Sequence, residues 1–182
     1  AWFKKYADAC EEAAKTAEPS WAKELLRNAE ILRTASWDAP KTLHEAGQLM
    51  WGFALWDWVD CVGRFDQYLY PFWTGSDDDR QMIAELIMKV WEHGSHNVVL
   101  GGVKPNDGTD ASNDITYLVI QIIRANHDVH PRVAVRIHEN TPEDLLDLIV
   151  ETWSEGMSDP TVASDVQIIP GLMGYGVSLE DA

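Results

Sequence analysis

From Asn97 onward, short apolar segments alternate with segments that have the spacing of amphipathic helices. The predicted strands are 97–102, 132–138 and 161–163, and the predicted helices that follow them are 113–126, 142–155 and 165–174. Strands and helices that alternate in this way form parallel β/α units with right-handed crossovers. Three strands alone would leave an open sheet. We therefore predict an α/β fold in which they are part of a larger barrel or doubly wound sheet.

The first half of the chain is predicted to be mostly helical. Apolar stripes and capping residues indicate helices at 2–17, 20–34, 42–57 and 79–92. The third of these helices is apolar on nearly every side, so we expect it to be buried. We describe the chain as a single partial domain with a helical part (1–60), an aromatic segment and helix (61–96) and β/α units (97–182).

The composition of the chain limits the partners that it can bind and the cell compartment in which it works. The chain of 182 residues carries a net charge of -16, which argues against nucleic acid or an anionic membrane as a partner. No apolar run approaches the roughly 20 residues that span a bilayer. Cys10 and Cys61 are isolated, which favours a reducing compartment such as the cytoplasm. Cys61 is a candidate nucleophile, although without a recognisable base a packed thiol is the simpler interpretation.

The segment from Gly63 to Pro71, Gly-Arg-Phe-Asp-Gln-Tyr-Leu-Tyr-Pro, combines charged, amide and aromatic side chains. Arg64, Asp66 and Gln67 need polar partners if they are buried. The segment is too aromatic for a solvated loop and too polar for an ordinary core strand. We interpret it as a rigidly held segment inside a large enzyme, in which Arg64 and Asp66 are ion-paired and hydrogen-bonded scaffold.

Two pairs of histidines, His93 with His96 and His127 with His130, have a spacing at which histidines bind zinc. Neither pair includes the glutamate of a His-Glu-x-x-His motif. We interpret them as histidines of turns and helix ends and predict no metal site. A free-standing metal hydrolase remains as an alternative, which would require stoichiometric zinc.

Polar residues also follow the predicted strands. The loop 101–108 lacks the spacing of a phosphate-binding loop, but it follows the end of a strand and is expected to border a site. Ser112 or Asn113 is expected to cap the next helix. Residues 136–140 are expected to form the rim of a pocket, and Thr141 to cap the helix that follows.

Four of these stretches, taken together, resemble the glycyl radical enzymes of the pyruvate formate-lyase superfamily. Gly63 to Pro71 is similar to the family's GRFDQYxYP segment, and 100–118 resembles its GG…DATNELSYL stretch. Residues 136–143 resemble RIHxxTPE, and 176–182 resembles the start of GVSLEDARDY. The four similarities occur in the family's order, which makes the resemblance specific for the superfamily.

The resemblance implies a ten-stranded β/α barrel and a lyase, dehydratase or decarboxylase of anaerobic metabolism. In the family, a cysteine becomes a thiyl radical and abstracts hydrogen from a small organic substrate. The radical is stored on a glycine, where a radical SAM iron–sulfur activating enzyme installs it. Both radical residues lie beyond the segment matched here, so we expect this chain to be an internal fragment that is inactive alone. The full-length protein is expected to be a cytoplasmic homodimer that binds no other cofactor.

The resemblance also suggests which residues face the substrate. Diol dehydratases of the family carry a His-Ser pair where this sequence has Trp58 and Val59, which implies a substrate less polar than a diol. Ser95, His96 and Asn97 are further candidates, because residues just before the Gly-Gly strand border the pocket in the family. The link before that strand is shorter here than in the family.

A second hypothesis is not enzymatic. A split or decayed barrel piece would expose strand edges, and such edges favour association with other chains. On this hypothesis the protein is an interaction module.

Overall fold

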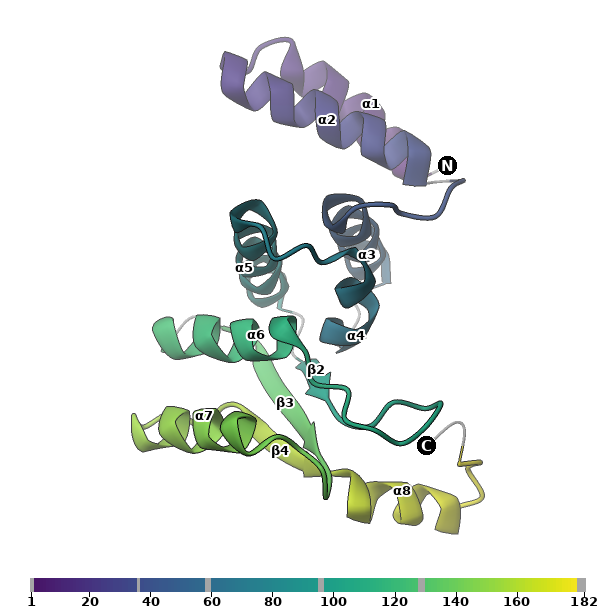
Figure 1. The fold of residues 1–182 in the computed structure, drawn as a ribbon. Coiled ribbons are helices and arrows are strands. Elements are labelled where there is room, and N and C mark those ends of the chain that lie inside the picture. Colours follow the sequence, from purple (N-terminus) through teal and green to yellow (C-terminus); the bar gives the residue numbers. More distant parts are fainter. Residues whose placement is uncertain (1, 36, 58–59, 95–96, 128–129, 180–182) are drawn as a thin grey trace.

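The computed structural model describes residues 2–35, 37–57, 60–94, 97–127 and 130–179. Five helices, a 3-10 turn and a short strand occupy the first part of the chain, and β/α units occupy the second (Figure 1). The elements are α1 (Trp2–Ala14), α2 (Pro19–Ala35), α3 (Leu43–Asp57), β1 (Cys61–Arg64), α4 (Phe65–Leu69), a 3-10 turn η1 (Tyr70–Phe72), α5 (Asp77–Glu92), β2 (Asn97–Gly101), α6 (Asp114–Ala125), β3 (Arg132–Ile137), α7 (Glu143–Ser154), β4 (Thr161–Ser164) and α8 (Asp165–Gly174). This arrangement confirms the predicted α/β fold, in which N-terminal helices precede β/α units.

The sheet contains four described strands in the order β1-β2-β3-β4, and every neighbouring pair is parallel. The three strands predicted from apolar runs are present as β2, β3 and β4. The register pairs Gly101 with Arg136 and, on the next strand, Arg136 with Ala163. Because all four strands are parallel, their C-terminal ends lie along one edge of the sheet.

The strand β1 was not predicted. It includes Gly63 and Arg64, which we had assigned to a segment too polar for a strand. Only four residues long, β1 shows a shifted register against β2, and Gly63 has a φ of 73°. A strand this short and irregular cannot display the alternation on which sequence-based prediction relies. Its second half was therefore assigned to a rigidly held segment and not to a strand.

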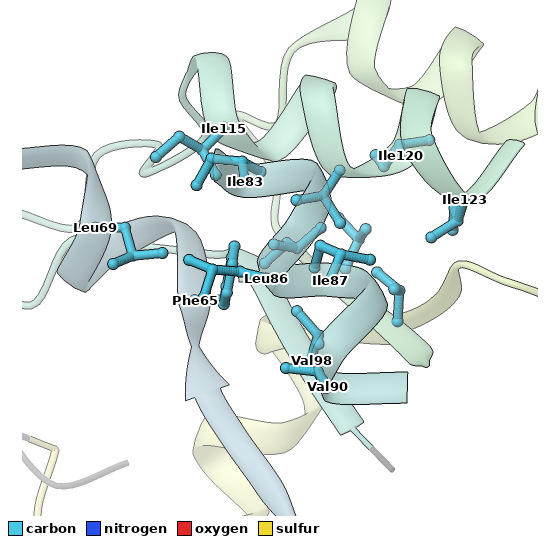
Figure 2. Packing of buried hydrophobic residues seen from close by; sticks show 14 of the residues in the cluster. Phe65, Leu69, Ile83, Leu86, Ile87, Val90, Val98, Ile115, Ile120 and Ile123 are labelled. Atoms are coloured by element: carbon cyan, nitrogen blue, oxygen red, sulfur yellow. The ribbon is translucent and has the colours of Figure 1, made fainter. Parts of the chain in front are cut away.

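One face of the sheet is packed against helices. Val98 and Leu100 of β2 and Val133 and Val135 of β3 are fully buried, whereas the residues between them are only partly buried. The buried side chains meet apolar residues of α4, α5, α6 and α7 in one continuous core (Figure 2). Those contributed by α5 and α6 are Ile83, Leu86, Ile87, Val90, Ile115, Val119, Ile120 and Ile123.

The other face of the sheet bears the alternate side chains, which include Val99, Ala134 and Arg136. Each of these is half-buried. We refer to this side as the uncovered face. It carries small side chains in the middle of the strands and arginines at their C-terminal ends.

The helix α3 is less buried than its composition suggested. Phe53 is 50% exposed, and α3 lines an apolar cavity of about 380 Å³ together with β1 and α4. Among the described residues, α3 contacts only α2, α4 and α5 extensively, which is too few neighbours to cover all its sides. Leu43, Ala46 and Ala54 are buried, so the prediction that α3 would be buried is correct for that side of the helix and wrong for Phe53.

The hairpin of α1 and α2 has a small core of its own. Ala7, Ala29 and Leu32 are buried there, with Phe3 and Cys10 packed against them. Arg33 also joins the two helices through hydrogen bonds to Asp8 and Glu11. Of the helices in the described residues, none has both the length and the apolar character needed to cross a membrane.

Candidate functional site

The C-terminal edge of the sheet is shaped by two glycines at the end of β2. Gly101 and Gly102 have φ values of 66° and 86°, in the left-handed region that favours glycine. A Cβ atom on Gly101 would lie 3.1 Å from the Arg136 carbonyl oxygen. The chain then leaves the sheet as a loop that returns at Ala111, whose N–H donates to the Gly102 carbonyl (2.9 Å). The backbone at this edge is therefore closely packed without any side chain from the two glycines.

Asp66 is the central buried group of this edge. Its Oδ2 accepts hydrogen bonds from the Gly101 N–H (2.8 Å) and from the Thr116 hydroxyl (2.5 Å), and the residue has no exposed surface. Burial raises the pKa of this carboxyl group, although both hydrogen bonds act in the opposite direction. Oδ1 has no partner among the described residues. Asp66 thus fixes the end of β2 to the first turn of α6.

Arg64 binds the carbonyl group of the same glycine, which belongs to the next peptide group. Its Nη2 donates to the Gly101 carbonyl oxygen (2.6 Å), while its Nε is buried and has no acceptor in the described part of the chain. Burial, and then the positive charge of Arg136, lower the pKa of the guanidinium. Among the described residues, Arg64 and Asp66 make the expected hydrogen bonds but not the expected ion pairs. Asp66 is fully buried against Gly101 and Thr116, whereas Arg64 is only partly buried at the end of β1.

Gln67 and Asn113 tie the same segment to the returning loop. The Gln67 Nε2 donates to the Ala111 carbonyl (2.8 Å), and the Asn113 Nδ2 donates to the Asp66 carbonyl (3.3 Å). Asn113 also caps α6 in a reciprocal capping box with Thr116, which confirms one of the two predicted caps. The segment predicted to need polar partners therefore finds them in residues that are distant in sequence.

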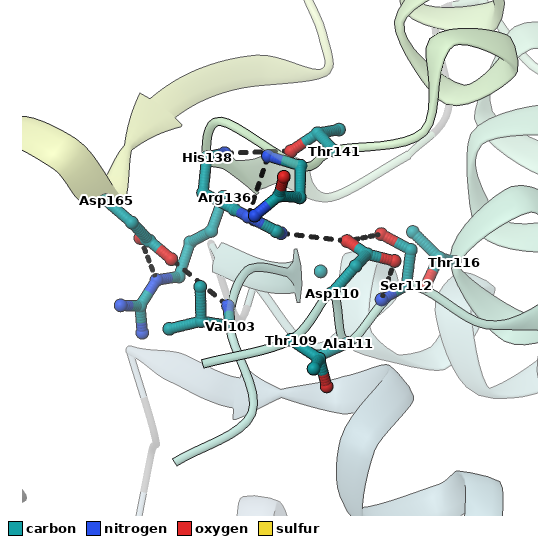
Figure 3. A network of polar contacts seen from close by, with 12 residues as sticks. Val103, Thr109, Asp110, Ala111, Ser112, Thr116, Arg136, His138, Thr141 and Asp165 are labelled. Atoms are coloured by element: carbon teal, nitrogen blue, oxygen red, sulfur yellow. Dashed lines mark hydrogen bonds and ion pairs between the residues drawn. The ribbon is translucent and has the colours of Figure 1, made fainter. Parts of the chain in front are cut away.

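Asp165, the first residue of α8, connects two parts of the edge. It is 2% exposed, accepts from the Arg136 Nε at 2.6 Å and accepts from the Val103 N–H at 3.2 Å (Figure 3). Sequence analysis did not single out Asp165 as a functional residue. Its position two residues after the apolar segment 161–163 was the available signal, because polar residues that follow parallel strands gather at one edge.

A second polar cluster in Figure 3 joins the loop to the end of β3. The His138 Nε2 lies 3.0 Å from Asp110 Oδ1, and the Ser112 hydroxyl donates to the same oxygen (3.1 Å). The His138 Nδ1 accepts from the Asn140 N–H (3.3 Å), so the proton is on Nε2. The serine is hydrogen-bonded to the carboxylate and not to the imidazole. This arrangement lacks the Ser–His contact that activates a nucleophile.

The predicted cap at Thr141 was wrong. The Thr141 hydroxyl accepts from the His138 N–H (2.8 Å) and so stabilises the turn after β3, while Pro142 occupies the N-cap position of α7 without a side-chain hydrogen bond. The expected pocket rim at 136–140 does lie at the C-terminal edge, through Arg136 and His138.

Most of the predicted substrate-facing residues cannot be placed. Trp58, Val59, Ser95 and His96 lie outside the described residues. Asn97 begins β2, at the opposite end of the strand from Gly101, and its N–H donates to the Asp60 carbonyl (3.1 Å). The structure does not bring Asn97 to the C-terminal edge.

The cysteines and histidines form no catalytic cluster in the described part of the chain. Cys61 begins β1 and its sulfur accepts from the Gly63 N–H (3.3 Å). Burial, and then the charge of Glu11, raise the pKa of the Cys10 thiol, which disfavours the reactive thiolate. The His130 Nδ1 lies 2.8 Å from the Pro131 carbonyl. Among the described residues, no three His, Cys, Asp or Glu side chains are placed to hold a metal ion.

The fold defines a class of protein in which a parallel β/α sheet carries polar groups at the C-terminal ends of its strands. Comparisons with known proteins agree with this class. The model of the family described as "Pyruvate formate lyase-like" matches residues 1–182. The isethionate sulfite-lyase of Nitratidesulfovibrio vulgaris is 28% identical over 214 residues, which cover 100% of this chain and 26% of that protein.

Two solved structures superpose on nearly the whole chain. The B12-independent glycerol dehydratase of Clostridium butyricum, in a glycerol-bound form, gives a TM-score of 0.82 at 26% identity and is matched over 98% of this chain and 26% of its own. A glycyl radical enzyme from Archaeoglobus fulgidus gives 0.83 at 25% identity, over 98% of this chain and 27% of its own.

The chain therefore belongs to the pyruvate formate lyase-like family, and glycyl radical enzymes are among its relatives. It spans about a quarter of the length of the relatives that it matches. The family resemblance found in the four sequence stretches is confirmed.

We predict that Asp66→Ala lowers the free energy of unfolding by about 3 kcal/mol, because the Gly101 N–H and the Thr116 hydroxyl lose their acceptor in a buried site. Urea unfolding followed by tryptophan fluorescence measures this change. Asp38→Ala, in an exposed loop, is the matched control and should unfold close to wild type. Wild-type stability for Asp66→Ala would show that the buried hydrogen bonds do not hold this edge together.

A second prediction concerns pH. Because burial raises the pKa of Asp66 above the ordinary value of 3.8, the folded protein keeps this proton to a higher pH than the unfolded chain does. The contribution of Asp66 to the free energy of unfolding should therefore fall as the pH rises from 3.8 through the pKa that Asp66 has in the folded protein. The difference in unfolding free energy between wild type and Asp66→Asn should decrease over this range.

Asp107→Asn provides a control of opposite sign for this titration. The hydroxyl and the backbone N–H of Thr109 lower the pKa of Asp107, so its contribution grows as the pH rises towards the ordinary value. Parallel stability curves for wild type and Asp66→Asn would contradict the assignment to Asp66.

Proposed function

We propose that this chain supplies part of the barrel wall of a glycyl radical lyase, dehydratase or decarboxylase. The complete enzyme would cleave a bond in a small organic substrate after a thiyl radical abstracts hydrogen from it. The observation that carries the proposal is the four-stranded parallel sheet, which superposes on a glycerol dehydratase over 98% of the chain. The active sites of parallel β/α folds lie at the C-terminal edge of the strands.

The residues described here support a role in shaping the barrel. Asp66, Arg64 and Gln67 fix the ends of β1 and β2, while Asp165 and Arg136 fix β3 and the start of α8. A closely packed wall of this kind suits an enzyme that must exclude water and oxygen from a radical. In the proposed enzyme these residues position backbone and do not react.

The radical chemistry itself would come from elsewhere in the complete protein. Cys10 packs within the α1–α2 hairpin and Cys61 begins β1, so neither lies at the C-terminal edge. We propose that the thiyl cysteine and the radical glycine belong to further sequence, that a radical SAM activating enzyme installs the radical and that the complete enzyme is a homodimer. The chain by itself would then be inactive.

The first test is made on the gene and on its product. The reading frame is expected to continue from Glu180-Asp181-Ala182 into Arg-Asp-Tyr and then Gly-Cys. The complete protein, incubated anaerobically with its activating enzyme, should give an organic radical signal in electron paramagnetic resonance, and the 182-residue chain should give none. A natural stop codon after Ala182, or a complete protein that never acquires the radical, would contradict the proposal.

We further propose that the substrate is less polar than a diol where it meets Trp58 and Val59. The indole and the isopropyl group cannot replace the hydrogen bonds that an imidazole and a hydroxyl provide to a diol. In the complete protein, Trp58→His combined with Val59→Ser should raise the turnover of 1,2-propanediol by about tenfold or more. The measurement is aldehyde release, with Trp37→His, at an exposed position, as control. If the double variant turned over 1,2-propanediol no faster than the unaltered protein does, the proposal would be wrong.

One observation favours the alternative of a non-catalytic interaction module. Within the described residues β4 pairs only with β3, and α8 exposes Val166, Ile168, Leu172 and Met173. An open edge beside an apolar helix favours association with another chain. The sequencing result above separates the two functions, because an interaction module would need no catalytic cysteine downstream.

A further inference from the structure

We propose that the α1–α2 hairpin is a detachable unit of the fold, and that protonation of His44 weakens its docking on α3. The proposal goes beyond the proposed function and does not depend on it. It concerns two helices that Figure 1 shows on the opposite side of α3 and α5 from the sheet.

The hairpin is held together without the main core. Its own core consists of Ala7, Ala29 and Leu32, and in the described residues the main core includes no side chain from α1 or α2. The loop that leads to α3 is exposed at Trp37 and Asp38. Because its internal packing involves only α1 and α2, the hairpin can separate from α3 and stay folded.

One of the contacts that dock the hairpin is apolar. The Phe3 ring of α1 lies against the backbone of Gly52, where an added Cβ atom would be 2.4 Å from the ring. The same ring meets the Phe53 ring nearly at a right angle, with 5.8 Å between their centres. Phe53 is itself half-exposed, so this contact buries little surface.

The other contact is polar and passes through Asn28 of α2. Its Oδ1 lies 2.9 Å from the His44 Nε2 and accepts from the Gln48 Nε2 at 3.3 Å. Because this oxygen is an acceptor, the His44 Nε2 carries a proton, and Nδ1 is the atom that titrates. A second proton on the ring would therefore charge a side chain that lies in the interface between α2 and α3.

The surroundings of His44 disfavour that charge. The ring is half-buried, and burial, followed by the positive charge of Arg27 on α2, lowers its pKa. Glu24 of α2, Glu45 of α3 and Glu85 of α5 act in the opposite direction, but only through their charges at longer range. The docked hairpin therefore holds His44 in its neutral form.

Solvent reaches this interface through a cleft. The cleft has a volume of about 620 Å³, lies between α2, α3 and α5, and is lined by His44. The other charged residues that α5 contributes to its lining are Asp78, Asp79 and Lys89. Water in the cleft screens their charges and supplies protons to the ring.

The docked and detached hairpins differ in how readily His44 binds a proton. Detachment exposes the ring to water, where its pKa takes the ordinary value of 6.5, and docking lowers that pKa. Docking is therefore at full strength above pH 6.5 and weakens as the pH falls from 6.5 towards the lower pKa of the docked form.

The test follows docking by NMR in the isotope-labelled chain. An NOE between the Phe3 ring protons and the Gly52 Hα protons reports the docked hairpin, and an NOE between the methyl groups of Ala7 and Ala29 reports its internal packing. Lowering the pH from about 7.5 to about 5.5 should weaken the first NOE and leave the second unchanged. A constant first NOE overturns the proposal, and so does the loss of both together, which would mean that the hairpin unfolds and does not detach.

A variant assigns the pH dependence to the imidazole. His44→Gln keeps an N–H donor for Asn28 but does not titrate, so its Phe3–Gly52 NOE should be equally strong at both pH values. His127→Gln, at an exposed position after α6, is the matched control and should behave like wild type. Docking that still weakens with acid in a folded His44→Gln chain overturns the proposal.

A measurement on the wild-type chain does not depend on any variant folding. The ring carbon resonances of His44, followed against pH, should titrate with a midpoint below 6.5. A midpoint at or above that value overturns the proposal, because docking would then favour the protonated ring. None of these results depends on radical formation, so the outcome here and the outcome for the barrel proposal are separate.

Discussion

The arrangement of this chain depends on the hydrogen bonds that converge on the peptide groups of Gly101. Asp66 accepts from its N–H and Arg64 donates to its carbonyl oxygen, so the residue at the end of β2 is held by two side chains of the preceding β/α segment. The carboxylate is wholly buried and its second bond, to Thr116, fixes the helix that follows. The ends of β1 and β2 and the start of α6 therefore have one defined geometry. Arg136 and Asp165 extend this geometry to β3 and α8.

This constraint explains why polar residues occupy a segment next to a large apolar core. Phe65 and Leu69 of α4 are buried in the core, and Asp66 lies between them in sequence with no exposed surface. Burial of a carboxylate is unfavourable by itself, and it is tolerated here because fixed donors surround one of its oxygens. Arg64, two residues before Asp66, is only partly buried at the end of β1. One short segment thus contributes both to the packed side and to the polar edge.

Sequence analysis recovered the features that depend on local pattern. Apolar runs identified β2, β3 and β4, and the polar residues before the apolar stripe of α6 gave Ser112 or Asn113 as its cap, of which Asn113 is the one observed. The family resemblance rested on short stretches that can be compared directly.

What the sequence did not reveal depends on contacts between distant residues. Asp66 bonds to residues 35 and 50 positions away, Asp165 to one 62 positions away, and no pattern within a window of ten residues indicates such partners. The strand β1 escaped prediction because its four residues are irregular, and the exposure of Phe53 on α3 was missed because composition does not reveal how many neighbours a helix has.

The order of the strands has a consequence for how the chain is made. Each strand lies beside the one that precedes it in sequence, and each adjacent pair is joined by one crossover that carries its own helices. Every pairing therefore requires only the residues that have already left the ribosome, and each new β/α unit can dock on a finished neighbour. The bonds of Asp66 to Gly101 and Thr116 form when the second unit emerges, and those of Asp165 when the last one does. Folding of this sheet during synthesis can proceed from the N-terminus without waiting for distant segments.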